Sequence, residues 1–388
     1  MTDVLVVGAS AAGLATAEAL RRRGFTGSIR LLGAEEHPPY DRPPLSKEVL
    51  AGTRDPERVV LRGADDLAAL DIELVTGRGA TALDVVRREV SDTAGRRHAY
   101  GSLVIATGLT PRRLGRFAGP AGVHVLRTVE DTRRLHADLL TARRLVVLGG
   151  GVLGCEIAAT ARQRGLDVTL VDRGPAPMAR QAGPRLGALL ADLHRAHGVK
   201  VLTDVTVEDP VVHEARVTGV RTSAGRIAAD AVVVAVGATP ATGWLRGSGL
   251  VLSDGVVCDS RCRAAEGVYA VGDVARWWHE GQGRSVRLEN RTNATEQALA
   301  VADNIMGADR PYVPVPYFWT DQYDVRMQVF GDLAGADALR VLEGDPATRK
   351  FVAAAESGGR VIGVVGWNSA RAVRRARGLI ADRGVVDA

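Results

Sequence analysis

Two segments of the chain carry glycines at the spacing that binds a dinucleotide. GASAAG spans residues 8–13 and GGGVLG spans residues 149–154, and each follows a run of apolar residues that predicts a buried strand. In such a segment the first glycine makes a tight turn, and the last lets the following helix pack close to the strand. The free N–H groups at the start of that helix can bind a pyrophosphate. We therefore predict two dinucleotide-binding sites in one chain.

The two glycine segments differ at their middle position. The second reads GxGxxG in full, whereas the first has Ser10, which fits there if its φ angle stays negative. Two sites in one chain predict FAD at the first and a nicotinamide dinucleotide at the second. The residues expected at the two pyrophosphates are Gly8, Ser10, Ala11, Ala12 and Gly13 in the first segment, and Gly149, Gly151, Val152, Leu153 and Gly154 in the second.

An acidic residue ends the second strand of each unit. Glu35 stands 22 positions after Gly13, and Asp172 closes the apolar strand predicted over residues 168–171. A carboxylate at this place binds the ribose hydroxyls of NAD and repels the 2′-phosphate of NADP. Arg173 follows Asp172 directly and could weaken that discrimination, and Arg180 is a further candidate contact. We predict NADH as the preferred dinucleotide, with NADPH less favoured.

Three more strand ends support a bound FAD. VIATGLTP spans residues 104–111, VVVAVGATP spans 232–240 and GVYAVGDVA spans 267–275. The carboxylate that follows the last of these strands can accept hydrogen bonds from the hydroxyls of the ribityl chain. The candidate residues at these ends are Ala106, Thr107, Gly108, Gly237, Gly272 and Asp273.

The segment HPPYDRPPLSK, residues 37–47, holds four prolines and ends on a lysine, in a chain with only three lysines. The prolines keep the backbone extended before the next helix. A thiol-using flavoenzyme, such as a coenzyme A-disulfide reductase or an NADH peroxidase, needs a low-pKa cysteine near the flavin. None of the three cysteines, Cys155, Cys258 and Cys262, falls near this segment, which argues against that class.

The order of these units predicts an α/β fold with two nested Rossmann-like domains of the glutathione-reductase type. We expect an FAD-binding domain from residues 1–110 and 238–310, interrupted by an NAD-binding domain from residues 111–237. Residues 311–388 are expected to form a small C-terminal α+β domain. Its strands are predicted at VRMQVFG, RKFVAAAE and RVIGVVGW, followed by a helix over about residues 370–381.

Composition limits the other classes of function. The net charge of +5 and the pI of about 9.4 reflect either an arginine-rich composition or a basic patch that steers an acidic partner. There is no zinc-finger or RNA-binding signature, so we expect no nucleic acid. The histidines lack ligand spacing, so no metal site is predicted. The lack of a leader-like start, the absence of a membrane-length apolar run and the few cysteines favour a soluble cytoplasmic protein without a membrane contact.

Five stretches together resemble one family: PPYDRPPLSK, GGGVLGCEIAAT, YAVGDVARW, RLENRTNATEQA and PYFWTDQYD. Over nearly its whole length the chain resembles the NADH-dependent, FAD-containing ferredoxin reductases that serve bacterial oxygenases and cytochromes P450. The resemblance implies a flavoprotein that takes hydride from NADH and passes single electrons to a small, acidic [2Fe–2S] ferredoxin. That ferredoxin would feed a P450 or a Rieske oxygenase. The reductase is expected to be a monomer or a weak homodimer.

The resemblance also implies roles for single residues. Lys47 is expected near flavin N5 and paired with Glu156, which faces the nicotinamide. Trp319 is expected against the flavin on the side of the iron–sulfur partner. The further FAD contacts that the resemblance implies are Arg42, Ala80, Arg127, Arg291, Thr292 and Ala294.

Several alternatives stay open. Lys47 could be a surface lysine after a turn, and Trp319 could serve only in packing. Arg291 stands where many relatives carry small or apolar residues, and it either places a cation near flavin N1/O2 or faces solvent. The protein could also be an NADH-sensing flavoprotein that governs a partner interaction, or a flavin oxidoreductase that acts without a ferredoxin.

Overall fold

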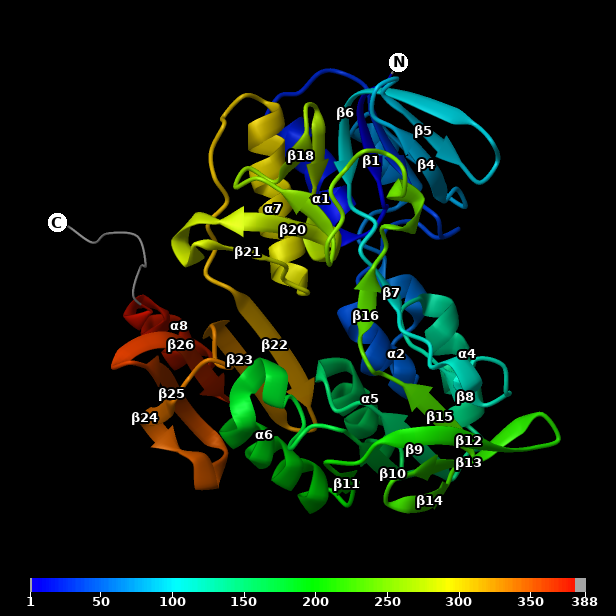
Figure 1. Cartoon of the computed structure of the whole chain (residues 1–388), viewed down its shortest axis with the longest axis vertical. Coiled ribbons are helices and arrows are strands. Elements are labelled where there is room, and N and C mark those ends of the chain that lie inside the picture. Colours follow the sequence, from blue (N-terminus) through cyan, green and yellow to red (C-terminus); the bar gives the residue numbers. More distant parts are fainter. Residues whose placement is uncertain (1, 381–388) are drawn as a thin grey trace.

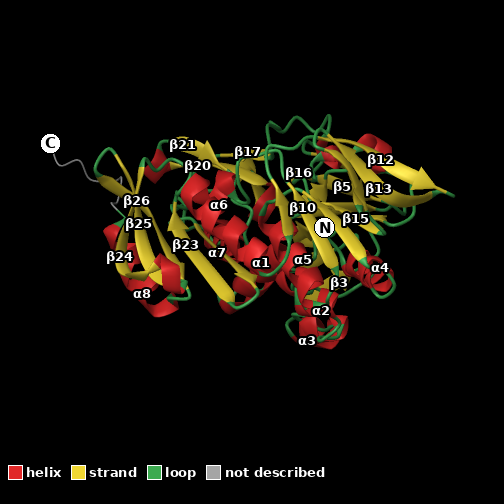
Figure 2. Ribbon diagram, turned by 90° about the horizontal axis from the view of Figure 1, so that it is seen from below, coloured by secondary structure: helices red, strands yellow, loops and turns green. Residues whose placement is uncertain are grey.

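Residues 2–380 are described in the computed structural model, and they form three units built around separate β-sheets (Figure 1). In Figure 1 the first unit lies at the top, and the second unit and the C-terminal unit lie below it. Seen from below in Figure 2, α1, α5, α6 and α7 lie in the middle of the molecule, between the C-terminal sheet and the strands on the other side, whereas α2 and α3 lie at the lower edge. No helix of the described chain is long and apolar enough to cross a membrane.

The first unit holds an eight-stranded sheet whose main strands run in the order β18-β19-β6-β1-β2-β3, and a separate three-stranded sheet in the order β17-β20-β21. The neighbours from β19 to β3 are parallel, and β1 is almost entirely buried, as its apolar sequence requires. Helices α1 and α7 pack against each other, so a segment from late in the sequence completes this unit. The elements are β1 (Thr2–Val7), α1 (Ala11–Arg22), β2 (Ile29–Leu32), α3 (Ala64–Ala69), β3 (Ile72–Val75), β4 (Ala80–Asp84), β5 (Glu89–Asp92), β6 (Arg97–Ile105), β17 (Val256–Cys258), β18 (Arg263–Ala265), β19 (Val268–Ala270), β20 (Ala275–His279), β21 (Arg284–Val286) and α7 (Arg291–Ile305).

The second unit is a five-stranded parallel sheet in the order β11-β10-β9-β15-β8. An antiparallel sheet, β12-β13-β14, extends from it (Figure 1). Helix α6 is interrupted at Gly183, which has a φ of +78° and is followed by Pro184. The elements are β8 (Val123–His124), α4 (Val129–Leu139), β9 (Arg144–Leu148), α5 (Val152–Gln163), β10 (Asp167–Val171), α6 (Ala179–Ala196), β11 (Lys200–Leu202), β12 (Val207–His213), β13 (Arg216–Thr222), β14 (Gly225–Ala228) and β15 (Ala231–Val234).

The chain crosses between the two units on a pair of short antiparallel strands. β7 (Leu109–Pro111) leads into the second unit and β16 (Ala238–Pro240) leads back, and the two strands pair with each other (Figure 1). The segment around α2 (Glu48–Ala51) lies before β7 in sequence, yet Leu45 and Leu50 pack in the hydrophobic core of the second unit. The expected division into domains stays a prediction. The segment around α2 belongs to the first domain by sequence position but packs against the second unit.

The C-terminal unit is a five-stranded antiparallel sheet in the order β22-β23-β26-β25-β24. The strands are β22 (Tyr317–Gln322), β23 (Val325–Gly331), β24 (Ala338–Asp345), β25 (Lys350–Ser357) and β26 (Arg360–Trp367). Three of them were expected from sequence, whereas β22 and β24 were not. Met327, Val329 and Trp367 of this sheet pack in the same core as the second unit. The C-terminal unit is therefore fastened to the second unit by a shared apolar interface.

The last helix is shorter than the sequence indicated. α8 covers Ala370–Ala376 and is followed by a single 3-10 turn at Arg377–Leu379, so the predicted helix over 370–381 is wrong in its length. Gly378 lies in that turn, and glycine is a poor helix former. Residue 381 lies outside the described residues. Val373 of α8 packs directly over Gly366 of β26, where a Cβ would lie 2.6 Å from the Val373 Cβ.

Candidate active site

The first glycine of each predicted site makes the same turn. Gly8 has a φ of +118° and Gly149 a φ of +104°, and both values favour glycine. A Cβ on Gly8 would lie 2.2 Å from the carbonyl oxygen of Ala106, and a Cβ on Gly149 would lie 2.4 Å from that of Ala235. Each glycine thus passes closely beneath the end of the neighbouring parallel strand.

The last glycine of each segment lets the helix approach its own turn. A Cβ on Gly13 or on Gly154 would lie 1.9 Å from the carbonyl oxygen of Gly8 or Gly149, respectively. The middle position is less demanding, because Ser10 has a φ of −121° and Gly151 one of −72°. A serine therefore fits the first turn without backbone strain. Ala11 and Ala12 begin α1, and Val152 and Leu153 begin α5.

The two predicted acids are held by different kinds of donor. Glu35 accepts hydrogen bonds from the Arg42 guanidinium at 2.6 Å and from the Tyr40 hydroxyl. Asp172 instead accepts from backbone N–H groups, those of Gly150 and, at 2.6 Å, Gly174. The acid of the first site is held by side chains of the proline segment that follows it, and that of the second by the backbone of the glycine turn and of the loop after β10. Arg173 and Arg180 are both exposed.

Two arginines and an aspartate gather beside the first glycine turn. Arg42 donates to the carbonyl oxygen of Arg127 at 2.6 Å, and the Arg127 guanidinium lies 3.4 Å from the Asp273 carboxylate. Burial raises the pKa of Asp273 above its usual value, although Arg127 opposes this shift. The adjacent Gly272 has its N–H fixed by the side-chain oxygen of Gln297 at 2.8 Å. Arg42 pairs with Glu35 and Arg127 pairs with Asp273, so both guanidinium groups are held beside the first glycine turn, where they can hydrogen-bond to a diphosphate.

Lys47 and Glu156 form an ion pair between two units. The Lys47 ammonium lies 2.7 Å from the Glu156 carboxylate, and their side chains are 15% and 7% exposed. The same oxygen of Glu156 accepts a hydrogen bond from Ser46 at 2.6 Å, and the other accepts one from Thr320 at 2.9 Å. Glu156 on α5 is therefore contacted by the proline segment and by β22. The surface position considered for Lys47 is wrong, because the side chain is largely buried.

Trp319, in the C-terminal unit, and Arg291, at the start of α7, both contact identifiable side chains. Trp319 on β22 is partly buried and stacks on Tyr317, with ring centroids 6.0 Å apart. Arg291 begins α7 and donates to the Asp41 carboxylate at 2.6 Å and to the Thr295 hydroxyl. This guanidinium is paired rather than solvent-facing. Thr292 and Ala294 lie in the first turns of the same helix.

The other predicted residues lie at strand ends. Thr107 donates to the Ala241 carbonyl at 3.0 Å, and a Cβ on Gly108 would lie 2.9 Å from the Arg127 guanidinium. Gly237 is exposed just before β16 and has a φ of +96°. Ala80 begins β4.

Sequence reasoning missed four residues that shape this site: Tyr40, Asp41, Gln297 and Thr320. Thr320 carried a usable signal, because alternation along a strand through PYFWTDQYD places it on the face opposite Trp319. The other three make contacts between segments far apart in sequence, which no local pattern indicates.

The three cysteines are all free and buried. Cys155 contacts the Gly150 carbonyl through its sulfur at 3.4 Å, and burial raises the pKa of its thiol. Burial also raises the pKa of the Cys262 thiol, to about 12. None of the three is therefore set up as a reactive thiolate.

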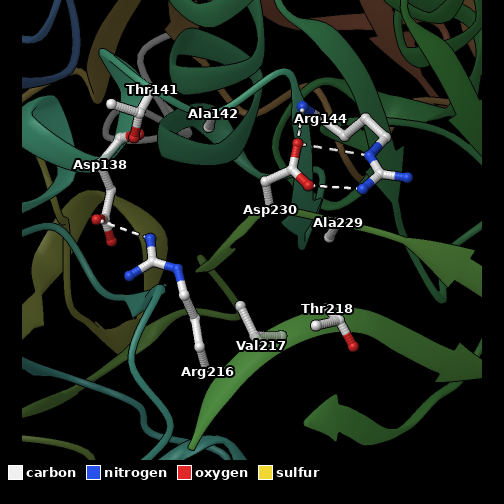
Figure 3. A pocket seen from close by; sticks show the side chains of 9 residues that line it. All are labelled: Asp138, Thr141, Ala142, Arg144, Arg216, Val217, Thr218, Ala229 and Asp230. Carbon is white, nitrogen blue, oxygen red and sulfur yellow. Dashed lines mark hydrogen bonds and ion pairs between the residues drawn. The ribbon is translucent and has the colours of Figure 1, made fainter. Parts of the chain in front are cut away.

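A separate cavity of about 380 Å³ opens on the second unit (Figure 3). Its charged residues already pair with one another: Arg144 contacts Asp230 at 2.6 Å, and Arg216 contacts Asp138 at 2.9 Å. None of the predicted site residues lines this cavity. It does not belong to the site described above.

Comparison with known proteins identifies the family. The model for pyridine nucleotide-disulphide oxidoreductases matches residues 2–298, and the model named reductase C-terminal matches residues 317–388. The chain belongs to the pyridine nucleotide-disulphide oxidoreductase family. It is an oxidoreductase with FAD and NAD(H) as its cofactors, which confirms the predicted enzyme class, fold class and cofactors.

Within this family, the chain is similar to ferredoxin reductases. It is 39% identical to the 5,5′-dehydrodivanillate O-demethylase ferredoxin reductase subunit of Sphingobium sp., over 99% of this chain and 94% of that protein. It is 37% identical to the anthranilate 1,2-dioxygenase system ferredoxin–NAD(+) reductase component of Burkholderia cepacia, over 99% and 95%. The solved structure of the covalent putidaredoxin reductase–putidaredoxin complex matches with a TM-score of 0.93 at 34% identity, over 98% and 93%. The resemblance drawn from the sequence is confirmed.

The residues present fit FAD at the first site. The tight turn at Gly8 and the close approach of Gly13 hold the start of α1 beside the end of β1. The first helical hydrogen bond of α1 runs from the Leu14 N–H to the Ser10 carbonyl, so the N–H groups before Leu14 at the helix start can bind a phosphate. The Nε of Arg42 is buried and has no hydrogen-bond partner among the described residues. Unpaired buried donors are rare, so this atom points to a missing acceptor such as a phosphate oxygen.

Proposed function

We propose that this flavoprotein takes hydride from NADH and passes electrons singly to a [2Fe–2S] ferredoxin that serves a P450 or a Rieske oxygenase. When bound, FAD accepts the electron pair of the hydride and releases it in two one-electron steps, to two ferredoxin molecules. The chain's own groups bind and orient the two dinucleotides. The names of the relatives support the partner, because they describe ferredoxin reductases of oxygenase systems.

The Lys47–Glu156 pair is the observation that carries the proposal. It joins the proline segment, which also ties down Glu35 through Arg42, to the start of the helix that follows the second glycine turn. We place the reacting rings of the two dinucleotides at this pair. A charge pair shielded from water can orient polar groups of both rings without taking part in covalent chemistry.

We further propose that the Asp172 carboxylate selects NADH. It lies at the end of β10, beside the second glycine turn, and it is partly exposed. A 2′-phosphate would place two negative charges together there. The exposed Arg173, next to Asp172 in sequence, would favour NADPH.

The face beside Trp319 is proposed to receive an acidic ferredoxin. A cavity of about 430 Å³ lies there between α7, β22 and β23, and it is lined by Arg374, Arg377, Thr292, Glu296, Val315, Tyr317, Gln328 and Phe330. Arg371, Arg374, Arg375 and Arg377 are exposed on α8 and the turn after it. Their charge would attract an acidic partner.

One experiment tests the reaction and the partner together. The FAD-loaded protein is mixed with NADH, cytochrome c and a purified acidic [2Fe–2S] ferredoxin. We expect rapid cytochrome c reduction with the ferredoxin and slow reduction without it, and weaker activity as salt is raised. Equal rates with and without ferredoxin would favour an oxidoreductase that acts without one. The monomeric or weakly dimeric state and the cytoplasmic location stay predictions.

A further inference from the structure

A chain of hydrogen bonds runs from the Glu156 carboxylate into the interface between the second and C-terminal units. Thr320 donates to Glu156 at 2.9 Å, and the side-chain amide of Gln322 donates to the Thr320 hydroxyl at 3.1 Å. The carbonyl oxygen of Gln322 lies 3.0 Å from Nε2 of His194. Nδ1 of His194 lies 3.0 Å from the Tyr323 hydroxyl.

The chain is closed to water along most of its length. Glu156 is 5% exposed, Thr320 is 1% exposed and Gln322 is 2% exposed, and His194 is fully buried. Tyr323 lies at the outer end, where its ring stacks on His197 with centroids 3.8 Å apart. Buried polar side chains of this kind are costly unless all are paired, so the order of donors and acceptors is restricted.

With Glu156 as the carboxylate that pairs with the Lys47 ammonium, only one direction of hydrogen bonding satisfies every member. The Gln322 carbonyl must accept, so His194 carries its proton on Nε2 and accepts from Tyr323 at Nδ1. The Thr320 hydroxyl accepts from the Gln322 amide and therefore gives its own proton to Glu156. If the Gln322 amide were reversed, its oxygen would take the Thr320 proton, and that oxygen of Glu156 would lose its donor.

We infer that Thr320, Gln322 and His194 are positioning residues, which hold the Glu156 carboxylate fixed opposite Lys47. This inference rests on the proposed role of Glu156 beside the nicotinamide. Every donor in this series of hydrogen bonds points toward the carboxylate, so the hydrogen bonds reinforce one another and restrict the position of the Glu156 side chain. Burial also lowers the pKa of His194 to about 4, which keeps the ring neutral as the direction requires.

The same series of hydrogen bonds links the position of β22 to the Lys47–Glu156 ion pair. Thr320 and Gln322 lie on the face of β22 that is turned to Glu156 and His194. Because side chains alternate along a strand, Trp319 lies on the opposite face. His194 belongs to α6 and Glu156 to α5, so both anchors lie in the second unit. Any shift of β22 that moves Trp319 must also disturb the donors to Glu156.

The first test reads the histidine directly in the FAD-loaded protein. Nitrogen-15 spectra of the histidine side chains are recorded at pH 7, and the His194 signals are assigned by their loss in His194→Gln. We expect a neutral ring with its proton on Nε2. A proton on Nδ1, or a charged ring, would overturn the directed chain, whatever the enzyme reduces.

The second test measures how the hydrogen bond from Thr320 to Glu156 affects the rate of flavin reduction. We expect Thr320→Val to slow flavin reduction at saturating NADH about tenfold, because a hydrogen bond to a charged group is lost. Thr320→Ser, which keeps the hydroxyl, should recover most of the rate. Thr132→Val is the matched control, since the Thr132 hydroxyl is buried on α4 and donates to the carbonyl of Thr128. Its reduction rate should equal that of the wild type.

A double-mutant cycle separates this role from simple packing. In a Glu156→Gln background the carboxylate charge is gone, so Thr320→Val should have much less effect on the rate and on the flavin midpoint potential. An equal effect in both backgrounds would overturn the inference and leave the proposed function standing. If Glu156→Gln alone left reduction by NADH unchanged, the proposed role of Glu156 would fail, and the inference with it.

Discussion

The two glycine turns have nearly the same backbone, yet their surroundings differ. The first turn is enclosed by groups from far along the chain, because Arg42, Arg127 and Asp273 gather beside it and Glu35 is held by side chains. At the second turn, Asp172 is held only by backbone N–H groups of adjoining loops. The difference suits a resident cofactor at the first site and an exchanging one at the second.

The largest expected effect comes from adding one methyl group to either turn. In Gly13→Ala the new Cβ would lie 1.9 Å from the Gly8 carbonyl oxygen, so the helix must move, and we expect FAD-free protein. Gly154→Ala repeats this clash with Gly149 and should keep FAD while losing reduction by NADH. Each variant should lower the free energy of unfolding by about 3 kcal/mol. The flavin-to-protein absorbance ratio after desalting, with stopped-flow reduction, separates the two.

The control for this pair is Gly115→Ala, where an added Cβ meets nothing within 4 Å. It should retain both FAD and reduction by NADH. Loss of FAD in both turn variants alike would contradict the contrast between the two sites.

The next effect is expected at the junction of the two sites. Lys47→Ala leaves the Glu156 carboxylate buried without its cation, so the free energy of unfolding should fall by about 3 kcal/mol, while FAD is retained. Flavin reduction by NADH should slow as well. Denaturant unfolding and stopped-flow absorbance measure the two effects. Lys350→Ala removes an exposed lysine of β25 and should change neither. If Lys47→Ala kept the stability and the flavin reduction rate of the wild type, the proposed role of the Lys47–Glu156 pair would be contradicted.

A smaller effect is expected at the exchanging site alone. Asp172→Ala should weaken NADH binding by about 1.4 kcal/mol, roughly tenfold, because the ribose hydroxyls lose their acceptor. NADPH binding should stay the same or improve, since a repelling charge is removed. The dependence of the stopped-flow flavin reduction rate on the concentration of NADH and of NADPH gives both affinities. Asp167→Ala, at an aspartate whose side chain is 84% exposed, is the control. Unchanged discrimination in Asp172→Ala would show that selection lies elsewhere.

The smallest effect is a pH dependence at the resident site. Burial raises the pKa of Asp273, so its charged form costs the folded apoprotein stability once the pH exceeds the usual aspartate value, near 4. Asp273→Asn removes that cost. The variant should therefore gain stability relative to the wild type at pH 7, and gain little or nothing at pH 4. Thermal unfolding of the two apoproteins at both pH values checks the sign, and a larger gain at pH 4 would contradict it.

Much of the fold was visible in the sequence because its signals are local. The apolar run before each glycine turn, the turn itself and the acid after the second strand lie within about 30 residues, the length of a βαβ unit. β22 was missed because each of its two alternating faces mixes aromatic and polar residues, so that neither is wholly apolar, and β24 was missed because it is mostly exposed or half-buried. The C-terminal helix was predicted too long because the apolar residues 379–381 continue the helical pattern after Gly378, where the helix is interrupted.

The site was predictable only in part. Lys47 and Glu156 were paired through a family resemblance, and the structure brings them together. The Asp41–Arg291 pair and the Gln297 contact with Gly272 were not foreseen, because each joins segments that only the folded chain brings together. Local patterns indicate which chemistry a segment can support, whereas the partners of each charge depend on tertiary packing.

The contrast between a resident and an exchanging dinucleotide can be tested most directly by loading the protein with FAD and NAD+ and then desalting it. We predict that the protein retains one FAD per chain, loses NAD+, and is then reduced rapidly by added NADH without further flavin. Loss of FAD together with NAD+, or retention of both, would contradict the account.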